Sequence, residues 1–228
     1  MPLPTPILTP LTLPPPAPAP PPPHLPCFSR YFELVRENFL DAKEWRLRKA
    51  AIGSLTSSSF GGEGRGEMAL EGIVNAMGDK VASVRVSGVE GLVSLLGALG
   101  MPWFEANAVP ILQKAYHTEN LSDGSGETKS SHLRRITVLT AIKCIAEDDA
   151  LIESNVASQA IELLVSIMEE AASDEVPNVR LFLAKLLPAV VRATAGGQSA
   201  NATTFLNSMS SDADADVAFF ANHALGQI

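Results

Sequence analysis

Cysteine, aromatic residues and long uncharged helical stretches are all scarce in this chain of 228 residues. Its two cysteines, Cys27 and Cys144, are too few for the disulfide framework of a small secreted domain, so a reduced intracellular setting is expected. Only two tyrosines occur, and no run of β-branched residues alternates as it would in a β-strand. Past the N-terminal region, the apolar uncharged stretch 91–104 contains only 14 residues, whereas a membrane-spanning helix needs roughly 20 apolar residues. We therefore expect neither a disulfide-rich fold, nor a β-sheet, nor a membrane partner.

Charge is also missing from one part of the chain. The net charge is −8, from 17 basic and 25 acidic residues, and none of these lies in residues 1–29. The acidic excess belongs to the remainder, and an acidic domain binds phosphate backbones poorly, so no nucleic-acid partner is expected. Because the first residues lack the positively charged start of a signal peptide, we expect a cytoplasmic location, with the nucleus left open.

Proline is concentrated at the start, where 13 of the 17 prolines fall within the first 26 residues. Proline fixes φ and removes an amide donor, so residues 1–28 are expected to form a disordered, extended arm of polyproline II character. Such an arm can serve as a ligand for a Pro-binding domain of the SH3 or WW type. The interpretation that the composition favours is a plain extension or spacer.

From residue 29 onward, apolar residues recur at helical spacing and one pattern is repeated five times. The segments RKAAIGSL, RVSGVEGL, RITVLTAI, RLFLAKLL and AFFANHAL begin at Arg48, Arg85, Arg135, Arg180 and Ala218, at intervals of 37, 50, 45 and 38 residues. In each segment a small or aliphatic residue follows the start after three positions, and an aliphatic residue follows after seven. This spacing predicts one buried face per helix. The residue before the start is apolar in every copy except the third, where it is Arg134.

Each copy is expected to be a hairpin of a helix A, a turn and a helix B. Asp79, Asp174 and Asp212 lie in three of the turns, where we expect them to cap the N-terminus of helix B. A polar insertion, residues 120–131, lengthens the turn of the third copy. We expect the copies at about residues 29–60, 66–100, 103–148, 152–195 and 198–228. The expected A helices are about 30–40, 67–77, 105–116, 153–170 and 199–209, and the expected B helices are about 45–57, 84–99, 133–146, 177–193 and 214–227.

A helical hairpin repeated about every 40 residues, with an aspartate in the turn and an arginine near the start of helix B, is the HEAT pattern. The predicted fold class is therefore all-α, an α-α superhelix of about five hairpins. The first hairpin is expected to present an uncovered apolar face at its end of the stack. Arg85 and Arg180 have two open roles: pairing with a turn aspartate to set the stacking, or contacting a partner.

The sequence contains no motif of catalysis or metal binding. Its four histidines and two cysteines lack the spacing of metal ligands, and the common hydrolase, phosphate-loop and zinc-protease motifs do not occur. The glycine cluster at 61–66 lies between two expected helices and follows no strand, so it is interpreted as a linker. An enzyme of the HEAT-like bilin lyase kind would need a polar constellation on the concave face, and the sequence offers none. We expect no enzymatic activity, no cofactor and no metal.

The row of A–B turns and helix B starts remains as the candidate working surface. Trp45 directly follows a polar turn and precedes Arg46, and tryptophan and arginine are the residues most enriched in interface hot spots. The alternative is that Trp45 packs across the turn onto the second copy.

Five segments, DAKEWRLRKAAI, GMPWFEANAVPILQKAY, LRRITVLTAIKCIAE, VPNVRLFLAKLLPAV and DADADVAFFANHALGQI, resemble in chain order the C-terminal HEAT repeats of the structural A (scaffold) subunit of serine/threonine protein phosphatase 2A. The resemblance covers about residues 30–228. It implies a non-catalytic scaffold that binds a phosphatase catalytic subunit through the ridge of A–B turns, without the repeats that hold the regulatory subunit. The alternative is a generic HEAT-repeat adaptor for another protein partner.

The resemblance also implies which residues touch the partner. By position, the strongest matches to the family's catalytic-subunit contacts are Lys43, Trp45 and Arg46. The family has tyrosines where this chain has Ala82 and His132, and it lacks the 120–131 insertion. The further contacts that we expect from this ridge are Arg85, His132, Arg135, Asn178 and Arg180.

Overall fold

The computed structural model describes residues 26–58, 65–117 and 132–228. The expected arm as far as residue 25, most of the glycine linker and the polar insertion of the third copy lie outside these residues. Helix α1 (Pro26–Val35) begins earlier than expected, so residues 26–28, assigned above to the arm, belong to the first helix. Proline is compatible with the first turn of a helix because the amide it lacks has no helical partner there.

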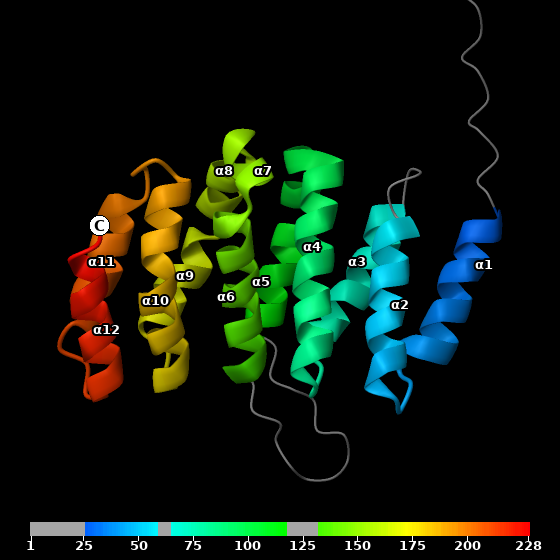
Figure 1. The fold of residues 1–228 in the computed structure, drawn as a ribbon, viewed down its shortest axis with the longest axis horizontal. Coiled ribbons are helices and arrows are strands. Elements are labelled where there is room, and N and C mark those ends of the chain that lie inside the picture. Colours follow the sequence, from blue (N-terminus) through cyan, green and yellow to red (C-terminus); the bar gives the residue numbers. More distant parts are fainter. Residues whose placement is uncertain (1–25, 59–64, 118–131) are drawn as a thin grey trace, which may run out of the picture.

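The described chain is helical throughout and forms hairpins that stack side by side in two layers (Figure 1). The A layer consists of α1 with the π-helical turn η1 (Arg36–Leu40), α3 (Arg65–Ala76), η3 (Phe104–Ala108) with α5 (Val109–His117), the series α7 (Asp149–Glu153), α8 (Val156–Leu163) and α9 (Val165–Ala172), and α11 (Ser199–Met209). The B layer consists of α2 (Trp45–Ser58), α4 (Ala82–Trp103), α6 (His132–Glu147), α10 (Pro177–Ala193) and α12 (Ala215–Leu225). The predicted all-α superhelix is thus confirmed. All five B helices begin along the lower edge of Figure 1, which is therefore the edge of the A–B turns.

The core follows the repeat that the sequence predicts. The residues three positions after each repeat start are all buried, and those seven positions after it are fully buried except at the last helix, where Leu225 is half-buried. At the first of these positions the second copy has Gly88, where a Cβ would lie 2.8 Å from the carbonyl oxygen of Ile73. Glycine therefore allows α3 and α4 to approach closely.

The helices are broken at Gly100, Asn155 and Leu164, and the sequence predicted only the first of these breaks. Gly100 has φ 75° and ends the straight part of α4 at the residue where the second copy is expected to end. The single helix expected over 153–170 is wrong. Asn155 adopts φ 60° and separates α7 from α8, and Leu164 separates α8 from α9. Asparagine tolerates the left-handed region. The spacing of apolar residues does not indicate that a single residue adopts this conformation.

By length and composition, the segment Ala82–His117 could cross a membrane, with a mean hydropathy of 1.4 over its most apolar window. Half of that window is buried inside the protein. The segment also contains the Gly100 break and supplies Leu92, Phe104 and Leu112 to the core. These are the properties of helices in the middle of a stack.

The first hairpin carries the exposed apolar face that the repeat analysis predicts. Leu34, Phe39 and Leu47 are each more than two-fifths exposed. Leu47 is the third residue of α2, and the third residues of α4, α10 and α12 are buried valines. Among the described residues, no earlier hairpin covers the first one.

Candidate functional site

Three bidentate ion pairs run along the A–B turn edge and join successive hairpins. Arg48 Nε and Nη2 lie 2.6 and 2.9 Å from the carboxylate of Asp79 in the next copy. The corresponding distances from Arg180 to Asp212 are 2.6 and 2.7 Å, and those from Arg135 to Asp174 are 2.7 and 3.0 Å. We call these three pairs the Arg–Asp ladder. Because all six side chains are at most 15% exposed, the pairs are poorly screened by water.

The turn aspartates do not cap helix B in the way the sequence analysis expected. The N-cap residues of α4, α10 and α12 are Val81, Val176 and Asp214, two positions after each aspartate. Each aspartate instead accepts a hydrogen bond from that N-cap amide at 2.7 to 2.9 Å, which makes an Asx turn before the helix. Its carboxylate then also faces the arginine of the preceding copy. One residue therefore shapes the turn and joins two hairpins.

Two of the ladder carboxylates, those of Asp79 and Asp212, are ionised at neutral pH. Burial by itself would raise the pKa of Asp79, but hydrogen bonds from Arg48 and from the Val81 amide hold that pKa below its ordinary value. Hydrogen bonds from Arg180 similarly lower the pKa of Asp212, against the effect of burial. The same contacts raise the pKa of each paired guanidinium. Both partners therefore remain charged over the whole physiological range.

The ladder is interrupted between the second and third copies. Arg85 occupies the ladder position of α4, but it donates to the carbonyl oxygens of Asp79 and Lys80 in its own turn, at 2.8 and 3.2 Å. Within the described residues it has no carboxylate partner. The turn that would supply one contains the insertion, which lies outside the described residues.

The three strongest contact candidates lie together at the first turn. Lys43 is exposed, and its carbonyl oxygen accepts a hydrogen bond from Arg48, which fixes the turn from inside. Trp45 is half-buried against the core, and the guanidinium carbon of Arg46 lies 4.8 Å from its ring centroid. Arg46 also lies 3.6 Å from Glu44 and is largely exposed. Trp45 thus packs against the core and remains partly exposed.

The remaining five candidates fall into two groups. Arg135 and Arg180 are engaged in the ladder and only 13 and 15% exposed, so their geometry favours the stacking role. Arg85 is half-buried over its own turn. His132 is half-buried at the first residue of α6, and Asn178 is exposed in the first turn of α10. All eight lie at A–B turns or at the starts of B helices, and the exposed side chains among them are those of Lys43, Arg46 and Asn178.

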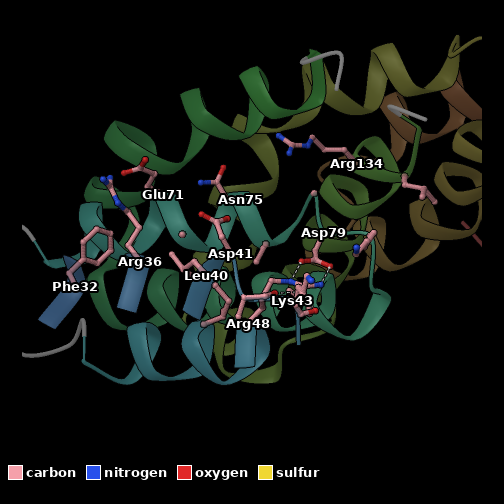
Figure 2. Close-up of a pocket in the computed structure, with 18 residues that line it drawn as sticks. Phe32, Arg36, Leu40, Asp41, Lys43, Arg48, Glu71, Asn75, Asp79 and Arg134 are labelled. Carbon is pink, nitrogen blue, oxygen red and sulfur yellow. Dashed lines mark hydrogen bonds and ion pairs between the residues drawn. The ribbon is translucent and has the colours of Figure 1, made fainter. Parts of the chain in front are cut away.

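The structure also reveals a cavity that the sequence analysis missed. It has a volume of about 840 Å³ and lies between the first two hairpins and the start of α6 (Figure 2). Arg134 enters it from α6, and the Nε atom of this arginine is buried without a hydrogen-bond partner among the described residues. Burial lowers the pKa of Arg134. The signal in the sequence was the single break of the apolar rule at Arg134. We call this cavity the arginine pocket.

The described residues show no arrangement suited to metal chemistry. No group of three or more His, Cys, Asp or Glu side chains in these ranges could hold a metal ion. Cys144 is half-buried in α6, and burial raises the pKa of its thiol. The thiol is therefore less nucleophilic than an ordinary surface cysteine.

Comparisons with known proteins give a structural likeness only. No protein-family model matches the chain, and no curated protein matches it. An engineered protein of known structure is 17% identical, with 86% of this chain and 79% of that chain covered and a TM-score of 0.42. The TOG domain of human Cep104 is 16% identical, with 89% of this chain and 83% of that domain covered and a TM-score of 0.46. At these values the likenesses carry no argument about function.

Proposed function

We propose that this protein is a non-catalytic scaffold that binds a partner protein through its A–B turn edge, and that the partner is a serine/threonine phosphatase catalytic subunit of type 2A. The supporting observation is the platform of Trp45 and Arg46 at the start of α2, with Lys43 beside it. A guanidinium stacked on a half-exposed tryptophan is a rigid surface that combines an aromatic face with positive charge. Such residues contribute most of the binding free energy in many interfaces.

The fold supports this proposal through the way the platform is held. Arg48 donates to the carbonyl oxygens of Ala42 and Lys43 at 2.6 and 3.1 Å, and its other nitrogens hold Asp79. The turn that carries Lys43 is thereby tied to the second hairpin. Little conformational entropy would be lost when a partner binds this turn, because the turn is already ordered.

Binding to a purified type 2A catalytic subunit tests the proposal. The double variant Trp45→Ala with Arg46→Glu removes the aromatic face and reverses the charge, and we expect its affinity to fall by roughly a hundredfold or more. The matched control is Arg192→Glu, which makes the same charge change at an exposed position in the last turn of α10, away from the A–B turns. Isothermal titration calorimetry would measure the affinity of wild type, the double variant and the control for the catalytic subunit. Wild-type protein that does not bind, or a double variant that binds as tightly as wild type, would rule the proposal out.

A generic helical-repeat adaptor is the second candidate. It is favoured by the exposed Leu34, Phe39 and Leu47 of the first hairpin, an apolar area that the type 2A proposal leaves unused. The two candidate functions can be distinguished by crosslinking. The purified full chain is crosslinked in a cell extract, and mass spectrometry identifies the crosslinked sites. Crosslinks at the Trp45 turn to a phosphatase subunit support the first candidate, and crosslinks only on the first hairpin to other proteins support the second.

A further inference from the structure

Arg134 occupies a position that the repeat otherwise reserves for a buried valine. The third residues of α4, α10 and α12 are Val84, Val179 and Val217, each at most 1% exposed. In α6 the third residue is Arg134, and within the described residues its buried Nε has no hydrogen-bond partner and its guanidinium makes no ion pair. A partly buried, unpaired guanidinium lowers the stability of the fold, whereas a valine there would not.

Space for this arginine is made by a glycine on the opposite wall. The Arg134 guanidinium covers Gly78, the residue before the second turn aspartate, and a Cβ at Gly78 would collide with it. The guanidinium therefore lies across the junction where the Arg–Asp ladder is interrupted. In the described part of the chain, the second and third hairpins meet there with an unpaired positive charge, where the other junctions have an ion pair.

The other charged groups of the arginine pocket give it a positive balance. Arg36, Lys43 and Lys80 line it and form no ion pair within the described residues. Two carboxylates, Asp41 and Glu71, also line it, and Arg48 and Asp79 neutralise each other. With Arg134, four cations that lack an ion pair in these ranges thus face two carboxylates. The pocket therefore attracts anions, but its two carboxylates repel an anion of high charge density.

The shape and the apolar lining suggest a larger ligand than a single small anion. Phe32, Leu40, Ile52, Val84 and Leu133 also line the pocket. Figure 2 shows Arg36, Lys43 and Arg134 at separate places around it, so the cations do not converge on one point. A cavity of about 840 Å³ is in the range that accommodates several linked groups.

We infer that the arginine pocket binds an acidic peptide segment of a partner protein, in which glutamate or aspartate carboxylates alternate with apolar side chains. One carboxylate takes both terminal nitrogens of Arg134, an arrangement that the planar guanidinium favours. A neighbouring carboxylate lies near Lys80 or Arg36, and the apolar side chains lie against Leu40 and Leu133. Lys43 lines this pocket and also lies in the turn of the proposed phosphatase-binding platform, but Trp45 and Arg46 do not line the pocket. The inference therefore rests on Arg134 and does not depend on the phosphatase as partner.

Fluorescence anisotropy with the full chain tests the inference. The probe is a short fluorescein-labelled peptide in which glutamates alternate with leucines. We expect Arg134→Met to weaken binding by at least roughly tenfold while leaving the unfolding temperature equal or higher, since methionine restores the apolar rule of the repeat. The matched control, Arg192→Met, removes an exposed arginine from α10 and should leave binding unchanged. Equal binding by wild type and Arg134→Met would overturn the inference.

A second variant and two further peptides separate recognition of carboxylates from apolar binding and from phosphate binding. Gly78→Ala should displace the flexible tip of Arg134 and weaken binding several-fold without unfolding the protein. A peptide with glutamine in place of glutamate should not bind, and tight binding of it would show that the pocket does not recognise charge. A peptide with phosphoserine in place of glutamate should bind no more tightly than the glutamate peptide. Preference for phosphoserine would overturn the inference in favour of a phosphate site.

Discussion

Two junctions between hairpins of this solenoid are built from the same repeat but differ in the contacts that their arginines make. Between the fourth and fifth hairpins, Val179 is buried and Arg180 holds Asp212 through two hydrogen bonds. Between the second and third hairpins, Arg85 turns back to its own turn, and Arg134 replaces the valine and lines a cavity that extends between the first two hairpins. At the junction of the fourth and fifth hairpins, Arg180 forms a stabilising ion pair. At the junction of the second and third hairpins, Arg134 has no ion pair among the described residues. The proposed peptide site thus includes an arginine from the junction where one standard contact is omitted.

The largest expected effect is at the closed junction. Arg180→Ala leaves the buried carboxylate of Asp212 without its partner, and we expect a loss of about 3 kcal/mol in the free energy of unfolding. Because neighbouring repeats unfold in part independently, the loss should be concentrated in α11 and α12. Hydrogen exchange would show faster exchange in those helices than in α2 and α4. Uniform destabilisation along the chain would contradict a local role for the ladder.

Acid should weaken the closed junctions before it affects the open one. The pKa values of Asp79 and Asp212 are lower in the folded than in the unfolded chain, so the folded state binds fewer protons. Their stabilisation is fully present above the unfolded value of about 3.9 and is lost as the pH falls through the lower folded values. Thermal unfolding followed between pH 7 and pH 2 should therefore show the unfolding temperature falling below about pH 4. The double variant Asp79→Asn with Asp212→Asn should start lower and fall less steeply.

At the open junction, a change of opposite sign is expected. Arg134→Val restores the residue type found in α4, α10 and α12. We expect the protein to gain about 1 kcal/mol in the free energy of unfolding, because a half-buried charge that has no ion pair within the described residues is replaced by an apolar group. Urea denaturation would measure the gain. The side chain of valine is smaller, so Arg134→Met is the companion variant that keeps the volume. A loss of stability in both variants would mean that Arg134 has a partner in the folded state.

An effect of similar size and opposite sign should come from Arg85. This arginine has two hydrogen bonds to backbone carbonyls and no carboxylate within the described residues. We expect Arg85→Ala to cost about 1 kcal/mol, well below the cost of Arg180→Ala. The same urea titration compares the two variants directly. An equal cost would remove the distinction between the two junctions.

The sequence predicted most of the fold because the fold is periodic. Residues three and seven positions after each repeat start are buried nearly without exception, and Gly100 breaks the chain where the second copy was expected to end. The break at Asn155 was missed, since the helical period of the apolar residues continues on either side of it. Periodicity reports which face of a helix is buried, and it does not report the backbone angles of one residue.

The candidate surface was predictable only in part. The sequence placed Lys43, Trp45 and Arg46 on one edge because they are consecutive with a turn. It did not distinguish an arginine that faces solvent from one that joins two hairpins, and Arg135 and Arg180 proved to be of the second kind. That distinction depends on where a side chain from the next copy lies, about 30 to 40 residues away in the chain.

By itself, the sequence determined the class of fold, the number and order of the hairpins, and which face of each helix is buried, because these follow from local periodicity. Only the tertiary structure decided that the turn aspartates shape an Asx turn and hold the preceding hairpin. It also decided that Arg85 lacks such a pairing within the described residues, and that Arg134 faces a cavity over Gly78. These outcomes depend on distances between residues that are remote in sequence. Hydrogen bonds and ion pairs form only within a few ångströms, so stacking the hairpins decides which pairs exist and which charges remain available to a ligand.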